Sequence, residues 1–368
     1  MDYTQDERIV MTLDAGGTKF AFSAVQRSEE IMPAVTVNAE SGSLEELLKK
    51  IIDGFREVRF AIDEPPVAIS FAFPGPADFE NGIIGDLQNL PFFRGGVALK
   101  NMLENAFGIP VFINNDGDLF AYGEAMSGFL PRLNALLRNH GIHREYRNLL
   151  GVTLGTGFGG GIVHRGHLFM GDNSAAGEIN RTRNYGILQT SIEDSVSIRA
   201  IKRVYAREAG IEVQDTPEAR VIYQIASGEL RGHQQAARKA FTGMAESAAD
   251  AIANAVSLVD GPVVIGGGLS GAYPVFLDTL VENMNRHFIT LSGETLERME
   301  VTAFNFEDPA SLNAFLRDTS REIPVPFSQE KVEYDPVKKI PVGVTPLGTS
   351  RAVSVGAYAF ALDELNRT

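Results

Sequence analysis

Short apolar runs alternate with amphipathic stretches along the chain, and glycine-rich turns follow several of these runs. In the first third, apolar runs predict strands at 9–13, 20–25, 67–73 and 110–113. A capping-box sequence begins at Ser43, and apolar residues follow at helical spacing over 44–58. A shorter helix is expected over 100–107, with Gly108 directly after its end. Strands alternating with helices predict an α/β fold with a mixed sheet.

A similar order of elements returns in the second half. Strands are expected at 149–154, 161–168 and 262–265, and helices at 192–209, 234–259 and 347–365. The repeated succession of strand, glycine turn and strand is consistent with a duplicated topology. Two polar stretches, 131–147 and 307–346, interrupt the pattern and read as insertions, because they are rich in charge or proline.

The 368 residues are enough for two domains. We predict an N-terminal α/β domain over 1–117. A larger C-terminal α/β domain over 118–346 would carry both insertions. The final helix, at about 347–368, is expected to pack onto the first domain.

Composition excludes several classes of function. The formal net charge is −14, which disfavours nucleic-acid binding because phosphate backbones attract cationic surfaces. The chain has no cysteine, so disulfides and thiolate metal sites are excluded. It has no apolar run that approaches the roughly 18 residues of a membrane span, and its acidic start differs from a secretory signal. We therefore expect a cytoplasmic protein that binds neither membrane nor nucleic acid.

The first glycine turn follows the strand at 9–13 and has the sequence Asp14-Ala-Gly16-Gly17-Thr18-Lys19. Glycines there would let backbone N–H groups approach an anion, and Thr18 and Lys19 add a hydroxyl and a cation. Asp14 could hold Mg²⁺ through water. The alternative is a plain hairpin turn, for which these residues are equally suitable.

The second glycine turn runs from Gly155 through Thr156, Gly157 and Gly159 to Gly161. It formally matches a dinucleotide fingerprint, but that motif requires a helix after its last glycine, and here a strand follows. A phosphate-binding hairpin fits better, and a strained hairpin without a ligand is the alternative. A third run, Gly266-Gly267-Gly268, follows the strand at 262–265 and would let backbone approach a flat ligand or a phosphate.

Polar residues that could act on a substrate follow a strand and a loop. Asn115 and Asp116 lie where the strand at 110–113 ends, and strand ends are where α/β sheets bind ligands. Asp116 could accept a proton from a hydroxyl that attacks phosphorus, or the pair could simply cap a helix. Glu178 ends a loop of small residues, and Glu193 begins a predicted helix. Such carboxylates can accept hydrogen bonds from sugar hydroxyls, although Glu193 alone could equally be a solvated side chain.

Together these segments resemble the ROK family of sugar kinases and sugar-responsive repressors, within the actin-like ATPase superfamily. The matching segments occur in the family's order: 14–19, 73–76, 89–91, 115–116 with 123–124, 154–159, 177–178 and 265–268. The resemblance implies a two-domain actin-like ATPase (ribonuclease H-like) fold with mixed sheets and an interdomain cleft. It also implies a homodimer.

The resemblance assigns a role to each candidate residue. Asp116 would be the catalytic base. The sugar would be bound by Asn115, Glu178, Glu193, Gly75 and Asn89. ATP, with Mg²⁺, would be held by the first glycine turn (Asp14, Gly16, Gly17, Thr18, Lys19), the second (Gly155, Thr156, Gly157, Gly159) and the third (Gly267, Gly268).

One departure from the family pattern falls after Glu178. Arg181 stands where many family kinases have a histidine that binds sugar and ligates a structural zinc, and residues 184–191 contain none of the zinc's cysteines. No structural zinc is therefore expected. Arg181 could recognise a negatively charged sugar or replace the metal with a salt bridge, and we favour the salt bridge.

The resemblance implies an ATP-dependent kinase that transfers the γ-phosphoryl group to a hydroxyl of a hexose, with glucose as the default substrate. An N-acetylated amino-hexose or fructose is the alternative substrate, and a non-catalytic sugar-binding ROK protein is the alternative function. A repressor is disfavoured because only eight residues precede the first predicted strand, too few for a helix-turn-helix.

Overall fold

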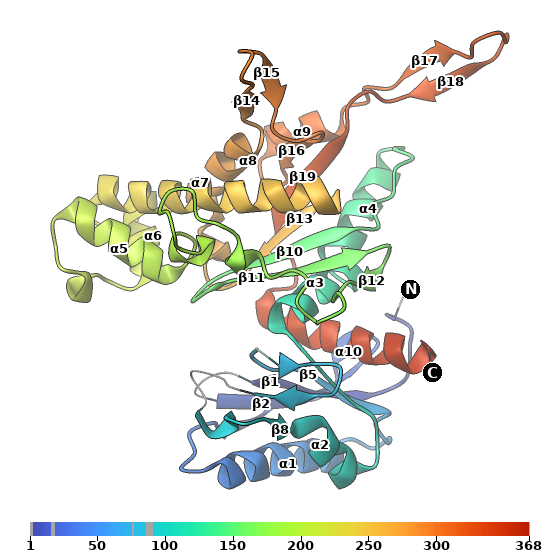
Figure 1. Ribbon diagram of the computed structural model, residues 1–368. Helices are drawn as coiled ribbons and strands as arrows, with labels where there is room; N and C mark the ends of the chain where they lie inside the picture. Colours follow the sequence, from blue (N-terminus) through green and yellow to red (C-terminus); the bar gives the residue numbers. More distant parts are fainter. Residues whose placement is uncertain (1–2, 16–18, 76, 86–90, 368) are drawn as a thin grey trace. The chain divides into compact units, whose positions relative to one another are not determined.

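The computed structural model describes residues 3–15, 19–75, 77–85 and 91–367, which form two compact units. Unit 1 comprises Met1–Pro131, Gly159–Glu178 and Thr345–Thr368, and unit 2 comprises Arg132–Phe158 and Ile179–Val344. In Figure 1, blue and red segments belong to unit 1, whereas yellow and orange segments belong to unit 2. The units are thus interleaved along the sequence, whereas the predicted domains were contiguous up to residue 346.

Unit 1 is built on a mixed sheet with the strand order β3-β2-β1-β5-β9, in which β4 also pairs with β2. Its strands are β1 (Val10–Ala15), β2 (Lys19–Gln26), β3 (Glu29–Glu30), β4 (Val35–Asn38), β5 (Ala68–Ala72) and β9 (Val111–Asn114). β1 and β2 pair antiparallel from Val10↔Val25 to Ala15↔Phe20, which confirms the predicted hairpin. β5 pairs parallel to both β1 and β9, so the carboxyl ends of β5 and β9 lie at the same end of the sheet.

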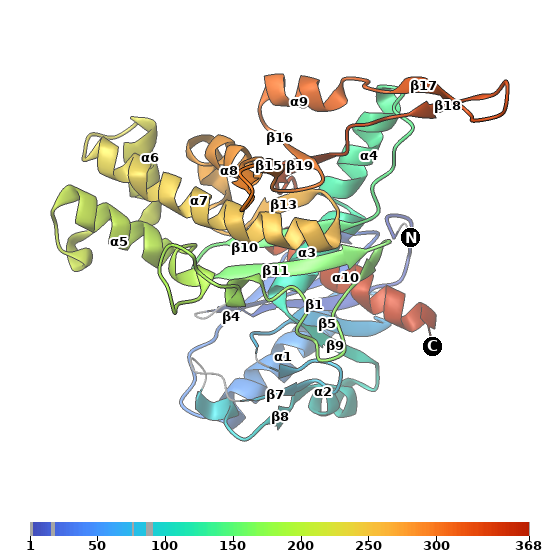
Figure 2. The same ribbon diagram turned by 45° about the horizontal axis from the view of Figure 1, so that its top comes forward.

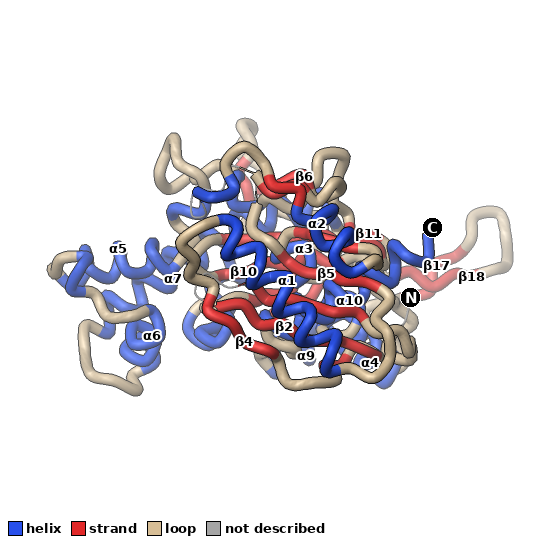
Figure 3. Tube along the Cα trace, turned by 90° about the horizontal axis from the view of Figure 1, so that it is seen from below, coloured by secondary structure: helices blue, strands red, loops and turns tan. Residues whose placement is uncertain are grey.

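One face of this sheet packs against α1 (Leu44–Ala61) and α2 (Leu99–Phe107), which Figure 3 shows crossing the strands. Ser43 caps α1 by accepting the Glu46 N–H, and the Glu46 carboxylate accepts the Gly42 N–H. The predicted capping box is confirmed, with the return bond one residue earlier than in the standard motif. Buried phenylalanines from β2, α1 and β5 fill the core between the helices and the sheet.

The other helices of this unit are α3 (Asp116–Met126) and α10 (Thr349–Arg367), and α10 packs on β1, β5 and β9. The two helices cross at glycines. A Cβ on Gly123 would lie 1.9 Å from the Ala352 carbonyl oxygen, and a Cβ on Gly356 would lie 1.9 Å from the Leu119 carbonyl oxygen. This backbone contact holds α3 in unit 1, although the predicted boundary at 117 assigned it to the second domain.

The smaller elements of unit 1 are β6 (Ala77–Asp78), β7 (Ile83–Ile84) and β8 (Val97–Ala98), which form a separate three-stranded sheet, and the 3₁₀ helix η1 (Pro91–Phe93). A second antiparallel hairpin joins β11 (Phe158–His164) to β12 (His167–Leu168).

Unit 2 contains four parallel strands in the order β10-β13-β19-β16. They are β10 (Leu149–Leu154), β13 (Val263–Gly266), β19 (Lys339–Val344) and β16 (Thr302–Asn305). Its helices are α4 (Phe129–Asn139), which begins in unit 1, α5 (Ile198–Ala209), α6 (Ala219–Ser227), α7 (Gln234–Val259), α8 (Leu277–Met284) and α9 (Pro309–Leu316). The long helix α7 packs against α5, α6, α8 and β10 (Figures 1 and 2).

Short elements complete unit 2. They are the 3₁₀ helices η2 (Ile179–Arg181), η3 (Ile192–Asp194), η4 (Val213–Asp215) and η5 (Ser270–Val275), and the hairpins β14 (His287–Ile289) with β15 (Thr295–Glu297) and β17 (Arg321–Pro324) with β18 (Lys331–Tyr334). None of the helices in the described part of the chain is long and apolar enough to cross a membrane.

Both stretches that read as insertions contain regular structure. The first, 131–147, is mostly helix α4, which accommodates Pro131 because a proline in the first helical turn removes no intrahelical bond. The second, 307–346, contains α9, the β17–β18 hairpin and the buried strand β19. β19 pairs on both sides despite Pro341, so this part of 307–346 is a strand of the sheet and its prediction as an insertion was wrong.

Candidate active site

The loop between β9 and α3 places Asp116 at the start of a buried helix. Asn115 is the N-cap of α3, and its side chain accepts the Gly117 N–H at 2.7 Å. The Asp116 carboxylate accepts the same N–H at 2.9 Å. The cap and the candidate base are therefore adjacent residues that share one donor, and the two interpretations of this pair are compatible.

Asp116 is accessible to solvent, although the protein atoms around it still desolvate its carboxylate. This burial raises the pKa of Asp116, hydrogen bonds from backbone N–H groups partly offset the rise, and the negative charge of Asp14 adds to it. A carboxylate with a raised pKa is a stronger base, and its accessible surface leaves it open to a substrate hydroxyl.

Asp118, which the sequence interpretation missed, adds a buried carboxyl group two residues after Asp116 in α3. It is 2 % exposed, and its Oδ1 has no hydrogen-bond partner among the described residues. Burial raises the pKa of Asp118 well above its ordinary value, and the negative charges of Glu178 and Asp116 raise it further. The charges of Glu178 and Asp116 therefore both act on Asp118, and all three residues belong to unit 1.

Glycines explain how Glu178 reaches the start of α3. A Cβ on Gly117 would lie 2.6 Å from the Gly160 carbonyl oxygen, and one on Gly161 would lie 2.5 Å from the Gly117 carbonyl oxygen. Gly177 has φ +80°, and a Cβ there would lie 3.0 Å from the same Gly160 oxygen. Strand β11 therefore fits between the start of α3 and the loop that ends at Glu178, and only glycine permits both approaches.

The first glycine turn is described only at its two ends. Asp14 is exposed at the end of β1, and Lys19 is exposed at the start of β2. Gly16, Gly17, Thr18 and Asn89 lie outside the described residues. Gly75 is exposed in the loop after β5.

The second and third glycine turns lie together in unit 2. The Gly155 N–H donates to the Gly157 carbonyl at 3.0 Å, and a Cβ on Gly155 would lie 3.6 Å from the Gly268 nitrogen. Gly267 has φ +84°, and its Cβ would lie 2.2 Å from the Leu154 carbonyl oxygen. Thr156 is exposed between the two glycines of its turn. Gly159 follows on β11 and belongs to unit 1.

Glu193 lies on η3 and contacts the second glycine turn. Its Oε2 accepts the Phe158 N–H at 3.1 Å, and its Oε1 pairs with Arg199 at 3.2 Å. A Cβ on Gly157 would lie 2.6 Å from Glu193 Oε2, so the turn and the carboxylate are in direct contact. The structure thus shows Glu193 as a partner of backbone.

Arg181 is exposed at the end of η2. None of the ion pairs between described residues involves Arg181, so the favoured salt bridge is not formed there. Across the described residues, no group of three or more histidine, cysteine or acidic side chains is arranged to hold a metal ion.

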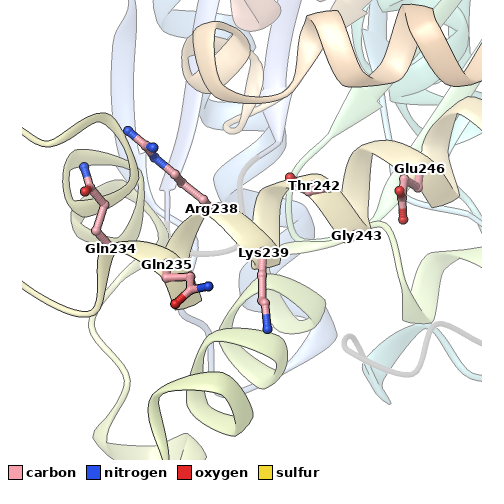
Figure 4. A pocket seen from close by; sticks show the side chains of 7 residues that line it. All are labelled: Gln234, Gln235, Arg238, Lys239, Thr242, Gly243 and Glu246. Carbon is pink, nitrogen blue, oxygen red and sulfur yellow. The ribbon is translucent and has the colours of Figure 1, made fainter.

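A shallow hollow of about 440 Å³ lies elsewhere, along the outer face of α7 (Figure 4). All seven lining residues come from that one helix: Gln234, Gln235, Arg238, Lys239, Thr242, Gly243 and Glu246. None of them is a candidate residue, and Lys239 is already paired with Glu208. The hollow is therefore not part of the candidate site.

Two α/β units with glycine turns at their strand ends, and a carboxylate at the start of a buried helix, define a protein of the actin-like ATPase fold. Residues 10–314 match the model of the ROK family, and the chain belongs to this family. The resemblance seen in the sequence motifs is confirmed.

Individual relatives cover three quarters of the chain or more. A glucokinase structure from Parabacteroides distasonis is 48 % identical, covers 99 % of this chain and 99 % of its own, and superposes with a TM-score of 0.89. The N-acetyl-D-glucosamine kinase of Photobacterium profundum is 26 % identical over 76 % of this chain and 90 % of its own. A Streptomyces griseus ROK glucokinase in complex with glucose and AMPPNP is 20 % identical, covers 95 % and 98 %, and has a TM-score of 0.61, which shows a shared fold.

Proposed function

We propose that this protein is an ATP-dependent sugar kinase that transfers the γ-phosphoryl group of ATP to a hydroxyl of a hexose. Glucose is the first candidate because the 48 % identical structure is a glucokinase. N-acetylglucosamine is the second, because a curated relative is a kinase of that sugar. The observation that carries the proposal is the accessible Asp116 at the start of α3, next to the buried Asp118, on which the charge of Glu178 also acts.

In this proposal Asp116 is the general base. Its carboxylate accepts the proton of the sugar hydroxyl while that oxygen forms a bond to the γ-phosphorus. The bond between that phosphorus and the bridging oxygen to the β-phosphate breaks, and ADP leaves. The desolvation that raises the pKa of Asp116 favours proton acceptance, because it destabilises the charged form before transfer.

The sugar is held by hydrogen bonds to groups around Asp116. Asn115 uses one amide oxygen lone pair as the helix cap and retains its Nδ2 for a substrate oxygen. Glu178 can accept bonds from two hydroxyls. Glu193, Gly75 and Asn89 are proposed as further sugar contacts on the basis of the family motif.

The glycine turns of unit 2 fit a nucleotide. Gly157 and Gly267 have no room for a Cβ, because Glu193 and Leu154 occupy that space. Gly268 is exposed and has no atom within 4 Å of a Cβ position, so its backbone is open to a ligand. These turns, including Gly155, Thr156 and Gly268, would hold ATP together with the first turn, Asp14 and Lys19. Mg²⁺ bound with ATP would neutralise phosphate charge, which matters in a chain of net charge −14.

A coupled assay of ADP release over a panel of sugars tests this proposal. With Mg-ATP present, turnover is expected on glucose or on N-acetylglucosamine, and NMR of the product identifies the phosphorylated hydroxyl. Binding of a sugar without any ADP release would favour the non-catalytic sugar-binding protein instead.

A further inference from the structure

The segment between Glu178 and α5 is closed around one buried amide side chain. Asn184 is fully buried, at 0 % exposure, although it lies in a loop. Its Oδ1 accepts the N–H groups of Gly186 at 3.0 Å and Ile187 at 3.1 Å. Its Nδ2 donates to the Ser191 carbonyl at 3.3 Å and to Ser195 Oγ at 2.8 Å. All four hydrogen-bonding positions of the amide are therefore used within this segment.

The two ends of the amide serve different parts of the segment. The oxygen fixes the start of the turn that follows Asn184, and the nitrogen fixes the residues on either side of η3, the element that carries Glu193. Two backbone hydrogen bonds stabilise the same segment. The Asn184 N–H donates to the Thr190 carbonyl, and the Ile192 N–H donates to the Thr182 carbonyl. The position of η3 thus depends on a side chain that is seven residues from Ser191 in sequence.

Glu193 connects η3 to the second glycine turn. Its carboxylate accepts the Phe158 N–H and contacts Gly157 so closely that a Cβ there would lie 2.6 Å from Oε2. The far side of the turn is fixed separately, because the Ile198 N–H donates to the Gly155 carbonyl at 2.8 Å. A shift of η3 would therefore release one side of the turn and leave the other in place.

We infer that Asn184 is a positioning residue, which holds Glu193 against Gly157 and Phe158 and so sets the conformation of the nucleotide turn. It touches neither the turn nor any proposed substrate contact except through Glu193. The inference deepens the proposed kinase function and rests on it only for its catalytic consequence. The structural consequence, an ordered turn in the free protein, does not depend on it.

Hydrogen–deuterium exchange of the ligand-free protein tests the structural part. Asn184→Ala should accelerate exchange of the peptide that contains Gly157 and Phe158 by about two- to tenfold, because the loss of one ordinary hydrogen bond corresponds to roughly that factor. Asn184→Asp keeps the acceptor for Gly186 and Ile187 but loses both donors, so it should produce the same acceleration at Phe158. Asn134→Ala is the matched control, since that amide also bridges backbone, to Tyr146, at a connection away from the glycine turns.

A double-mutant cycle on kcat/KM tests the catalytic part. If Asn184 acts through Glu193, the double variant Asn184→Ala/Glu193→Ala should lose no more activity than Glu193→Ala alone. The pair Asn134→Ala/Glu193→Ala should instead show independent effects. Unchanged exchange at Phe158 in Asn184→Ala, or fully additive losses in the cycle, would overturn the inference. Absence of kinase activity in the wild-type protein, with accelerated exchange in the variant, would overturn the proposed function and leave the positioning role intact.

Discussion

Asp118 is a buried acid that the fold tolerates beside the proposed base. Its Oδ1 has no partner among the described residues, and burial, Glu178 and Asp116 all disfavour its charged form. The raised pKa means that the folded protein binds a proton more tightly than the unfolded chain does. The resulting loss of stability is absent at pH values below the pKa of Asp118 in the unfolded chain. It grows as the pH rises toward the pKa of Asp118 in the folded protein.

Asp118→Asn should therefore stabilise the protein at neutral pH, because the amide has nearly the same shape and no charge to desolvate. Thermal unfolding should show a melting temperature above that of the wild type at pH 7. At a pH below the unfolded pKa of aspartate, the difference should shrink. A variant that melts below the wild type at pH 7 would show that the carboxylate makes a stabilising contact.

At the same scale, sequence reasoning succeeded where local chemistry was enough. The placement of Asn115 and Asp116 between a strand and a helix could be predicted, because a buried strand, a cap and a helix follow one another in sequence. Their roles in sugar binding and catalysis stay predictions. Asp118 could not be singled out, because an acidic residue in the first turn of a helix is common for reasons of the helix dipole. Its burial depends on Gly160 and Gly161, which approach from a strand some forty residues later.

At the scale of elements, glycines decide how closely helices and strands approach. Gly123 and Gly356 let α3 and α10 meet backbone to backbone, and the adjacent Glu124 is fully buried and accepts the Phe129 N–H at 2.7 Å. Its carboxylate also bonds Thr345 Oγ1. α3 therefore fixes both α10 and the start of α4, and it carries the proposed base at its first residue.

Gly123→Ala should destabilise the protein, because the new Cβ would meet the Ala352 carbonyl and force the helices apart. Overpacking of this kind typically costs about 1–3 kcal/mol. Gly243→Ala is the matched control, since no atom lies within 4 Å of a Cβ at that mid-helix position. That control should gain roughly 0.5–1 kcal/mol from helix propensity. Chemical denaturation that ranks the two variants in the opposite order would contradict this account of the crossing.

The same scale shows what periodicity alone missed. α4 and β19 were read as parts of insertions, because Pro131 and Pro341 with nearby charges masked their patterns. β19 is nevertheless buried, and the ammonium group of its Lys339 donates a hydrogen bond to the Arg317 carbonyl. In each case tertiary packing supplied the stabilisation that the local sequence did not indicate.

At the scale of the whole molecule, the chain passes between its two units after Pro131, Phe158, Glu178 and Val344. A contiguous division was the natural prediction from sequence, because it requires only one boundary. The observed one follows from long-range contacts: α10 returns to the sheet of unit 1, and β11 packs on the start of α3. The sequence analysis expected the return of α10 to the first domain, whereas the packing of β11 on α3 leaves no signal in composition or in periodicity.

Metal dependence should separate function from folding in the intact protein. A chelator should abolish ADP release, and added Mg²⁺ should restore it, because phosphate transfer requires charge neutralisation. The melting temperature of the ligand-free protein should not change, since the sequence around Arg181 predicts no structural zinc and the Asn184 amide bonds four partners in the same segment. A large fall in melting temperature with chelator, measured in the same samples, would reveal a structural metal.

The central claim is that Asp116 is the base of a sugar kinase, and its most direct test is the turnover number of Asp116→Asn. The amide keeps the shape of the side chain but cannot accept the hydroxyl proton, so kcat should fall by about 100- to 10,000-fold. Sugar binding, measured by calorimetry on the same variant, should remain close to that of the wild type. A variant that binds sugar normally and keeps a near-normal kcat would contradict the assignment.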